Sequence, residues 1–148
     1  MLQYEINTGS VPFMMKKLEN ILYLIAFIGL GLWFAYSKGW ILTNFESIDA
    51  QTAIQILETD NNISLLDVRT IAEYKEGHLQ DATLIPLQVL AQNLSKLASK
   101  KKHKIIVYCR SGNRSITASR ILEKHGFTPL NVKGGILALR KAHVTIVK

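Results

Sequence analysis

The sequence is poor in cysteine, and the single residue of this type, Cys109, limits the chemistry open to the chain. One cysteine excludes a disulfide within the chain and argues against a cysteine-rich metal site. The histidines at 78, 103, 125 and 143 are too dispersed to indicate a metal. We therefore expect no metal and no cofactor, and any reaction of Cys109 must proceed without a second thiol in the same chain.

A second absence concerns charge. The run from Ile21 to Tyr36 contains no charged residue, and it lacks the polar face that an amphipathic helix shows every three to four residues. A bilayer core of roughly 30 Å needs a few flanking residues as well. Aromatic residues that suit the interface lie near the ends of the run: Tyr23, Trp33, Tyr36 and Trp40. We expect an N-terminal tail over residues 1–17 and one transmembrane helix with its interfacial flank over 18–42.

A cleaved signal peptide is the alternative interpretation of this segment. Lys16 and Lys17 precede the apolar run as in a signal start, and Ala35 and Ser37 are small residues that suit a cleavage site. Bulky neighbours crowd that site, so we favour an uncleaved, single-pass anchor. The flanking lysines are nearly balanced and say little about orientation. Because a lone reactive thiol is most easily kept reduced in the cytoplasm, we expect a cytoplasmic domain, with a periplasmic or other extracytoplasmic location as the alternative.

The rest of the chain, residues 44–148, predicts one α/β domain in which strands and helices alternate. The predicted strands are 63–68, 82–86, 104–108 and 128–132. The predicted helices are 48–58, 70–76, 87–99, 111–125 and 136–142. We expect Ser47 to cap the first of these helices. Such alternation implies a mostly parallel sheet that is covered by helices on both faces.

Cys109 stands at the carboxyl end of the most apolar strand and just before a helix, which is the usual ligand edge of an open α/β sheet. Backbone amides of the loop and first helical turn converge there. Two arginines add positive charge, and together these effects favour the thiolate over the thiol. A buried structural cysteine is the alternative. We expect Cys109 to be catalytic, and the residues that follow it to bind an anionic substrate: Arg110, Ser111, Gly112, Asn113, Arg114 and Ser115.

This loop, Cys109-Arg-Ser-Gly-Asn-Arg114-Ser115, resembles the active-site loop of the rhodanese family. The stretch 67–86 is similar to the family's first signature, and Val132-Lys-Gly-Gly-Ile136 is similar to its closing one. The resemblance covers roughly residues 44–142. It implies a five-stranded, mostly parallel sheet and a sulfurtransferase that cycles through a persulfide on Cys109. Thiosulfate or a related small anionic donor would load the sulfur, and a thiol or protein acceptor would remove it.

Three other positions leave alternatives open. Asp67 and Arg69 end a neighbouring strand and could form a second shell of the same site, or an ion pair that only fixes the loops. His78 could act as a general base, or its ring could bond backbone at a turn. Leu139 stands about where the rhodanese family usually has a tryptophan, at a position that normally serves packing.

Two rival functions and one partner class remain to be weighed. A dual-specificity phosphatase also places a cysteine before an anion-binding loop that ends in arginine, but with five residues between them, whereas four separate Cys109 from Arg114. A membrane-tethered rhodanese-fold module that binds or regulates with little turnover is the other alternative. The net charge of +7 suits anionic ligands and the lipid bilayer. The basic cluster 100–104 lacks interleaved aromatic residues, so we expect no nucleic acid partner.

Overall fold

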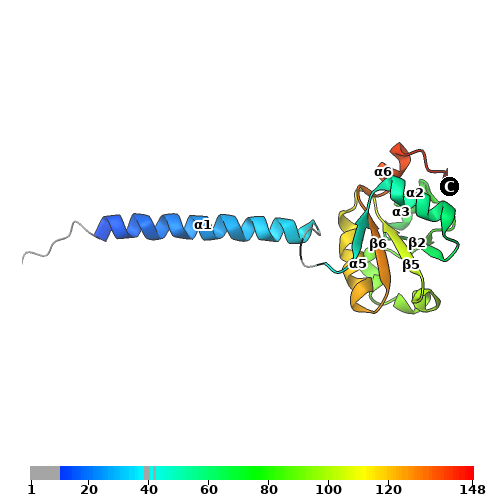
Figure 1. Cartoon of the computed structure of the whole chain (residues 1–148), viewed down its shortest axis with the longest axis horizontal. Coiled ribbons are helices and arrows are strands. Elements are labelled where there is room, and N and C mark those ends of the chain that lie inside the picture. Colours follow the sequence, from blue (N-terminus) through cyan, green and yellow to red (C-terminus); the bar gives the residue numbers. More distant parts are fainter. Residues whose placement is uncertain (1–10, 39–40, 42) are drawn as a thin grey trace, which may run out of the picture.

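The computed structural model describes residues 11–38, 41 and 43–148. A long helix, α1 (Val11–Ser37), projects away from an α/β domain formed by the chain that follows (Figure 1). Its segment Met15–Ser37 has a mean hydropathy of 1.8 in its most apolar window, and none of that window is buried. By length and composition alone, this helix is able to cross a membrane. The interfacial flank expected at Trp40 and Leu42 falls on residues outside those described.

The domain is built on a five-stranded sheet with strand order β1-β6-β5-β2-β4, in which every neighbouring pair is parallel. Its strands are β1 (Glu46–Ile48), β2 (Ile63–Asp67), β4 (Thr83–Leu84), β5 (Lys104–Tyr108) and β6 (Thr128–Val132). A separate antiparallel pair joins β3 (His78–Leu79) to β7 (Ile146–Val147). The predicted fold class, a mostly parallel five-stranded α/β sheet, is confirmed.

Helices cover both faces of the sheet, and the central strand β5 divides its side chains between them. Ile105 and Val107 belong to one buried cluster, with side chains of α4, η1 and α5. Ile106 and Tyr108 belong to the other, with side chains of α2 and α6. These elements are α2 (Ala50–Thr59), α4 (Leu87–Leu90), the 3₁₀ helix η1 (Leu94–Lys100), α5 (Asn113–Lys124) and α6 (Gly135–Lys141). Because β5 is buried on both sides, its carboxyl end is a firm support for Cys109.

The prediction that Ser47 caps the first helix of the domain is wrong. Ser47 lies within β1, which pairs with β6, and α2 starts later than expected. Asp49 is the N-cap, because its Oδ1 accepts a hydrogen bond of 2.8 Å from the Thr52 amide. Ser47 instead accepts a bond from the side chain of Asn131, its neighbour across the sheet.

The single helix predicted over 87–99 is also wrong, since the segment divides into α4 and η1. Asn93 lies at the break. Its side-chain amide donates to the Val89 carbonyl at 2.8 Å, while its backbone N–H donates to Leu90 at 3.0 Å. The side chain thus occupies the carbonyl that an α-helix would offer to the Asn93 backbone, and a tighter turn follows.

A glycine turn between β6 and α6 holds the backbone that follows β5. Ile136 and Leu137, in the first turn of α6, donate their amides to the carbonyls of Cys109 and Arg110 at 2.8 and 3.2 Å. Gly135 lies between the two segments with φ of +56°, and a Cβ there would overlap the Cys109 carbonyl oxygen. Only glycine permits this approach, so the turn fixes the position of the Cys109 backbone.

We expect Gly135→Ala to destabilise the domain far more than Gly126→Ala. Both glycines have positive φ, which costs an alanine about 1 kcal/mol, but a Cβ at Gly126 meets nothing within 4 Å. Overlap at Gly135 should add about 2 kcal/mol or more. Denaturant unfolding of both variants measures the difference. Equal losses would mean that the turn does not press on the Cys109 backbone.

Candidate active site

Cys109 follows β5 directly and is only 1% exposed. Its Sγ accepts a hydrogen bond of 3.2 Å from the backbone amide of Gly112. The sulfur therefore lies inside the turn made by the residues after it, in the position predicted from the strand–loop–helix pattern. A sulfur with an amide directed at it is placed to carry negative charge.

Gly112 makes the tight turn of the loop possible. It is the N-cap of α5 with φ of +94°, and a Cβ there would lie 3.0 Å from the Gly134 amide nitrogen. Its carbonyl accepts bonds from the Ser115 hydroxyl at 3.0 Å and the Ile116 amide at 3.3 Å. The loop is thus closed on the helix side by Ser115 and on the sheet side by the glycine turn before α6.

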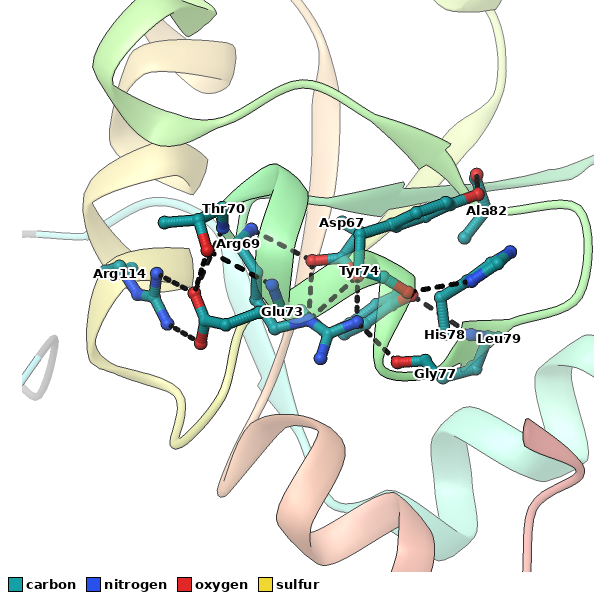
Figure 2. A network of polar contacts seen from close by, with 11 residues as sticks. Asp67, Arg69, Thr70, Glu73, Tyr74, Gly77, His78, Leu79, Ala82 and Arg114 are labelled. Atoms are coloured by element: carbon teal, nitrogen blue, oxygen red, sulfur yellow. Dashed lines mark hydrogen bonds and ion pairs between the residues drawn. The ribbon is translucent and has the colours of Figure 1, made fainter. Parts of the chain in front are cut away.

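Arg114 is held beside the loop by a carboxylate that was not among the predicted site residues. Glu73, in α3 (Ile71–Lys75), accepts two bonds from the Arg114 guanidinium at 2.6 and 2.8 Å (Figure 2). Thr70 caps α3 in a capping box with Glu73, so the carboxylate is fixed at the start of that helix. Glu73 also raises the pKa of Arg114, with a smaller contribution from Cys109.

The bond from Arg114 lowers the pKa of Glu73 to about 2. Sequence contained one signal for this carboxylate, the Thr70-x-x-Glu73 spacing of a capping box. Its partner lies 41 residues away in the chain, so only the fold brings Glu73 to the Cys109 loop.

Asp67 and Arg69 form an ion pair of 2.6 Å whose side chains are 0% and 4% exposed. Arg69 also donates to the Gly77 carbonyl at 2.8 Å (Figure 2). Its guanidinium carbon lies 5.7 Å from the Tyr108 ring centroid. None of the bonds found among the described residues joins this pair to the Cys109 loop. The pair ties the end of β2 to the turn before β3, the arrangement of an ion pair that fixes the loops.

The remaining loop residues face outward. Arg110, Ser111 and Asn113 are exposed; the Arg110 carbonyl is bound by α6, and Asn113 Oδ1 accepts a bond of 3.3 Å from Lys38. Six residues were predicted to bind substrate. The structure brings Gly112, Arg114 and Ser115 into the interior of the loop. The other three residues, Arg110, Ser111 and Asn113, form the outer wall of the loop.

At His78 and Leu139, the structure shows a backbone contact and a packing position. The His78 ring lies 3.1 Å from the Tyr74 carbonyl and stacks on the Tyr74 ring at 3.6 Å. Leu139 is fully buried in the cluster beneath α2 and α6, as expected of a packing position. Within the described part of the chain, no group of three or more His, Cys, Asp or Glu side chains could hold a metal ion.

We expect Glu73→Gln to reduce stability in a pH-dependent way. A carboxylate whose pKa falls from 4.5 to about 2 on folding stabilises the folded state above pH 4.5, and this contribution disappears as the pH drops toward 2. The side chains are about a quarter exposed, so the loss at pH 7 should be on the order of 1 kcal/mol. Unfolding measured from pH 7 to pH 2 should show the gap between variant and parent closing below pH 4.5. Glu76→Gln, an exposed neighbour, is the control, and an equal gap in both variants would contradict the assignment.

The rhodanese-like domain model matches residues 49–142 of the chain. The chain is 34% identical over 101 residues to a sulfurtransferase of Allochromatium vinosum, which covers 68% of this chain and 92% of that protein. It is 32% identical to the thiosulfate sulfurtransferase PspE of Escherichia coli over 48% of this chain and 68% of PspE.

A solved structure, that of a rhodanese-related protein from Thermoplasma volcanium, aligns with a TM-score of 0.63 and 27% identity, covering 70% of this chain and 98% of that one. The family model and the relatives coincide with the part of the chain that forms the sheet and the Cys109 loop, and the chain belongs to the rhodanese-like family.

Proposed function

We propose that the chain is a sulfurtransferase that carries sulfane sulfur as a persulfide on Cys109, with thiosulfate or a related small anion as donor. The observation that carries this proposal is the Gly112 amide directed at the Cys109 sulfur, in a loop whose carbonyls at Cys109, Arg110 and Gly112 are bound elsewhere. Sulfurtransferases among the relatives support the reaction class.

The reaction has two half-steps. The Cys109 thiolate attacks the outer sulfur of thiosulfate; a new S–S bond forms, the S–S bond of thiosulfate breaks, and sulfite leaves with the bonding electrons. An acceptor such as cyanide or a thiolate then attacks the outer sulfur of the persulfide, and the Cys109 thiolate leaves. Neither step consumes an oxidant or requires a general base, so the backbone contact of His78 does not hinder it.

The loop supplies electrostatic stabilisation. Its amides are fixed before the reaction, so they need not reorganise when the outer sulfur becomes anionic. Arg114 adds a full positive charge, and its bonds to Glu73 keep the guanidinium beside the loop. With four residues between Cys109 and Arg114, the ring suits a sulfur atom better than a phosphate ester.

We further propose that α1 anchors the enzyme in a membrane with the domain in the cytoplasm. The helix has 27 residues, which is roughly 40 Å, and its large apolar side chains from Met15 to Tyr36 are exposed. Such a surface is stable only when lipid or another apolar partner covers it. The cytoplasmic side follows from the need to keep the one thiol reduced.

We expect Cys109→Ser to abolish sulfur transfer from thiosulfate to cyanide, with a loss of at least about 10³-fold. A hydroxyl cannot form the persulfide, yet it fits the same space, so the unfolding midpoint should stay near that of the parent. Mass spectrometry after thiosulfate treatment should find one added sulfur atom on the parent and none on the variant. Turnover by the serine variant at a near-parental rate would refute the mechanism, and vigorous hydrolysis of an aryl phosphate by the parent would favour a phosphatase.

The full chain should fractionate with membranes and resist carbonate extraction. Because Cys109 is buried, its side of the membrane is best read from reporters in the Cys109→Ser background. Lys124→Cys, exposed on α5, should react with a membrane-impermeant thiol reagent only after cell lysis. Lys16→Cys, exposed on α1 before the apolar run, should react in intact cells. The reverse pattern would place the domain outside, and a mature chain that starts near Lys38 would indicate a cleaved signal peptide.

A further inference from the structure

A cleft of about 490 Å³ lies between the end of α1 and the outer wall of the Cys109 loop. Two lysines from distant parts of the chain, Lys38 after α1 and Lys133 after β6, both line it. Its other polar side chains include Ser47, Ser111, Asn113 and Asn131. Cys109 does not line it, so the cleft is separate from the sulfur itself.

Contacts with α5 hold the end of α1 at this cleft. The Arg120 guanidinium lies 3.9 Å from the Tyr36 ring centroid and donates to the Tyr36 carbonyl. The last turn of α1 contains no basic residue of its own, so Arg120 supplies the cation that a helix carboxyl end favours. Lys38 then reaches Asn113 in the first turn of α5. The membrane helix is thereby joined to the helix that carries the active-site loop.

The cleft favours an anion. Of the described residues that line it, none is acidic. Lys133 does act on one nearby carboxylate, Asp49, but that group is engaged in capping α2. Two lysines that line one cavity attract a phosphate, which several hydrogen-bond donors can then hold.

A buried amide at the cleft indicates a ligand with a donor group as well. Asn131 is 2% exposed, and its Nδ2 donates to Ser47 Oγ at 3.0 Å. Its Oδ1 has no hydrogen-bond partner among the described residues. A buried carbonyl oxygen without a partner is costly, and a hydroxyl or ammonium group on the ligand would complete it. Ser47 accepts from Asn131, so its own hydroxyl proton remains available to a phosphate oxygen.

The position of the cleft at the end of the apolar helix indicates that the phosphate belongs to a lipid headgroup. The apolar run of α1 ends at Tyr36, and Lys38 follows at the depth where lysine side chains reach lipid headgroups. We propose that the cleft binds the headgroup of an acidic phospholipid, with Lys38 and Lys133 on the phosphate and Asn131 on a headgroup hydroxyl. This inference rests on the proposed membrane anchor. The bound lipid would support the Cys109 loop from its outer side.

The test uses the full chain in phosphatidylcholine nanodiscs that contain a minor fraction of phosphatidylglycerol, with native mass spectrometry of the released protein. We expect one phosphatidylglycerol molecule to be retained in preference to phosphatidylcholine, and Lys133→Gln to weaken this retention about tenfold. Lys124→Gln, which removes the same charge from the far end of α5, should retain the lipid as the parent does. Near-identical melting of the two variants verifies that Lys133→Gln remains folded.

Other results of this experiment would overturn the proposal. Parental retention in Lys133→Gln would show that the lipid binds elsewhere, for example around α1. Displacement of the lipid by millimolar inorganic phosphate would make the cleft a site for free anions. Cys109→Ser must retain the lipid, whatever its sulfur transfer. A chain that does not enter nanodiscs would instead refute the membrane anchor, so the two failures can be told apart.

Discussion

The Gly112 amide faces the Cys109 sulfur in a segment whose carbonyls, at Cys109 and Arg110, are bound on the other side. The first turn of α6 supplies that binding, through the amides of Ile136 and Leu137. The contact requires a glycine at 135, since any Cβ would collide with the Cys109 carbonyl. The candidate active site at the end of β5 therefore depends on the β6–α6 turn, which holds it through backbone hydrogen bonds. A loop that is closed in this way has little freedom left to lose when the sulfur becomes charged.

The two ion pairs near the site differ in burial, and the difference separates their roles. The side chains of Asp67 and Arg69 are almost completely buried. Removing one partner of such a buried ion pair strongly destabilises the folded protein. Such a pair suits a permanent frame, here between β2 and the Gly77 turn. Glu73 and Arg114 remain about a quarter exposed, so water screens them and their net stabilisation is smaller. Their geometry, two parallel hydrogen bonds, gives Arg114 a fixed direction beside the loop.

Most of the correct predictions of strands and helices came from local sequence patterns. Strands β5 and β6 and helix α5 are marked by apolar runs and by glycine after the helix, so they were placed close to their observed bounds. Strands β1 and β7 have three and two residues, too few for a periodicity, and exist because a distant partner pairs with them. The break at Asn93 depends on one side chain in competition with the backbone. Glu73 was missed for a related reason, since its partner is remote in the chain.

The entry of the chain into the domain links the sheet to the proposed membrane. Seven residues separate Lys38 from Glu46, the first residue of edge strand β1, and they can span at most roughly 25 Å. With α1 in the bilayer, the bond from Lys38 to Asn113 holds the carboxyl edge of the sheet near the headgroups. The outer wall of the loop, at Ser111 and Asn113, then faces the interface while the Gly112 amide faces the sulfur. Under the proposed membrane anchor, one short loop would thus have a reactive side and a lipid side, and acceptors would reach the sulfur close to the membrane surface.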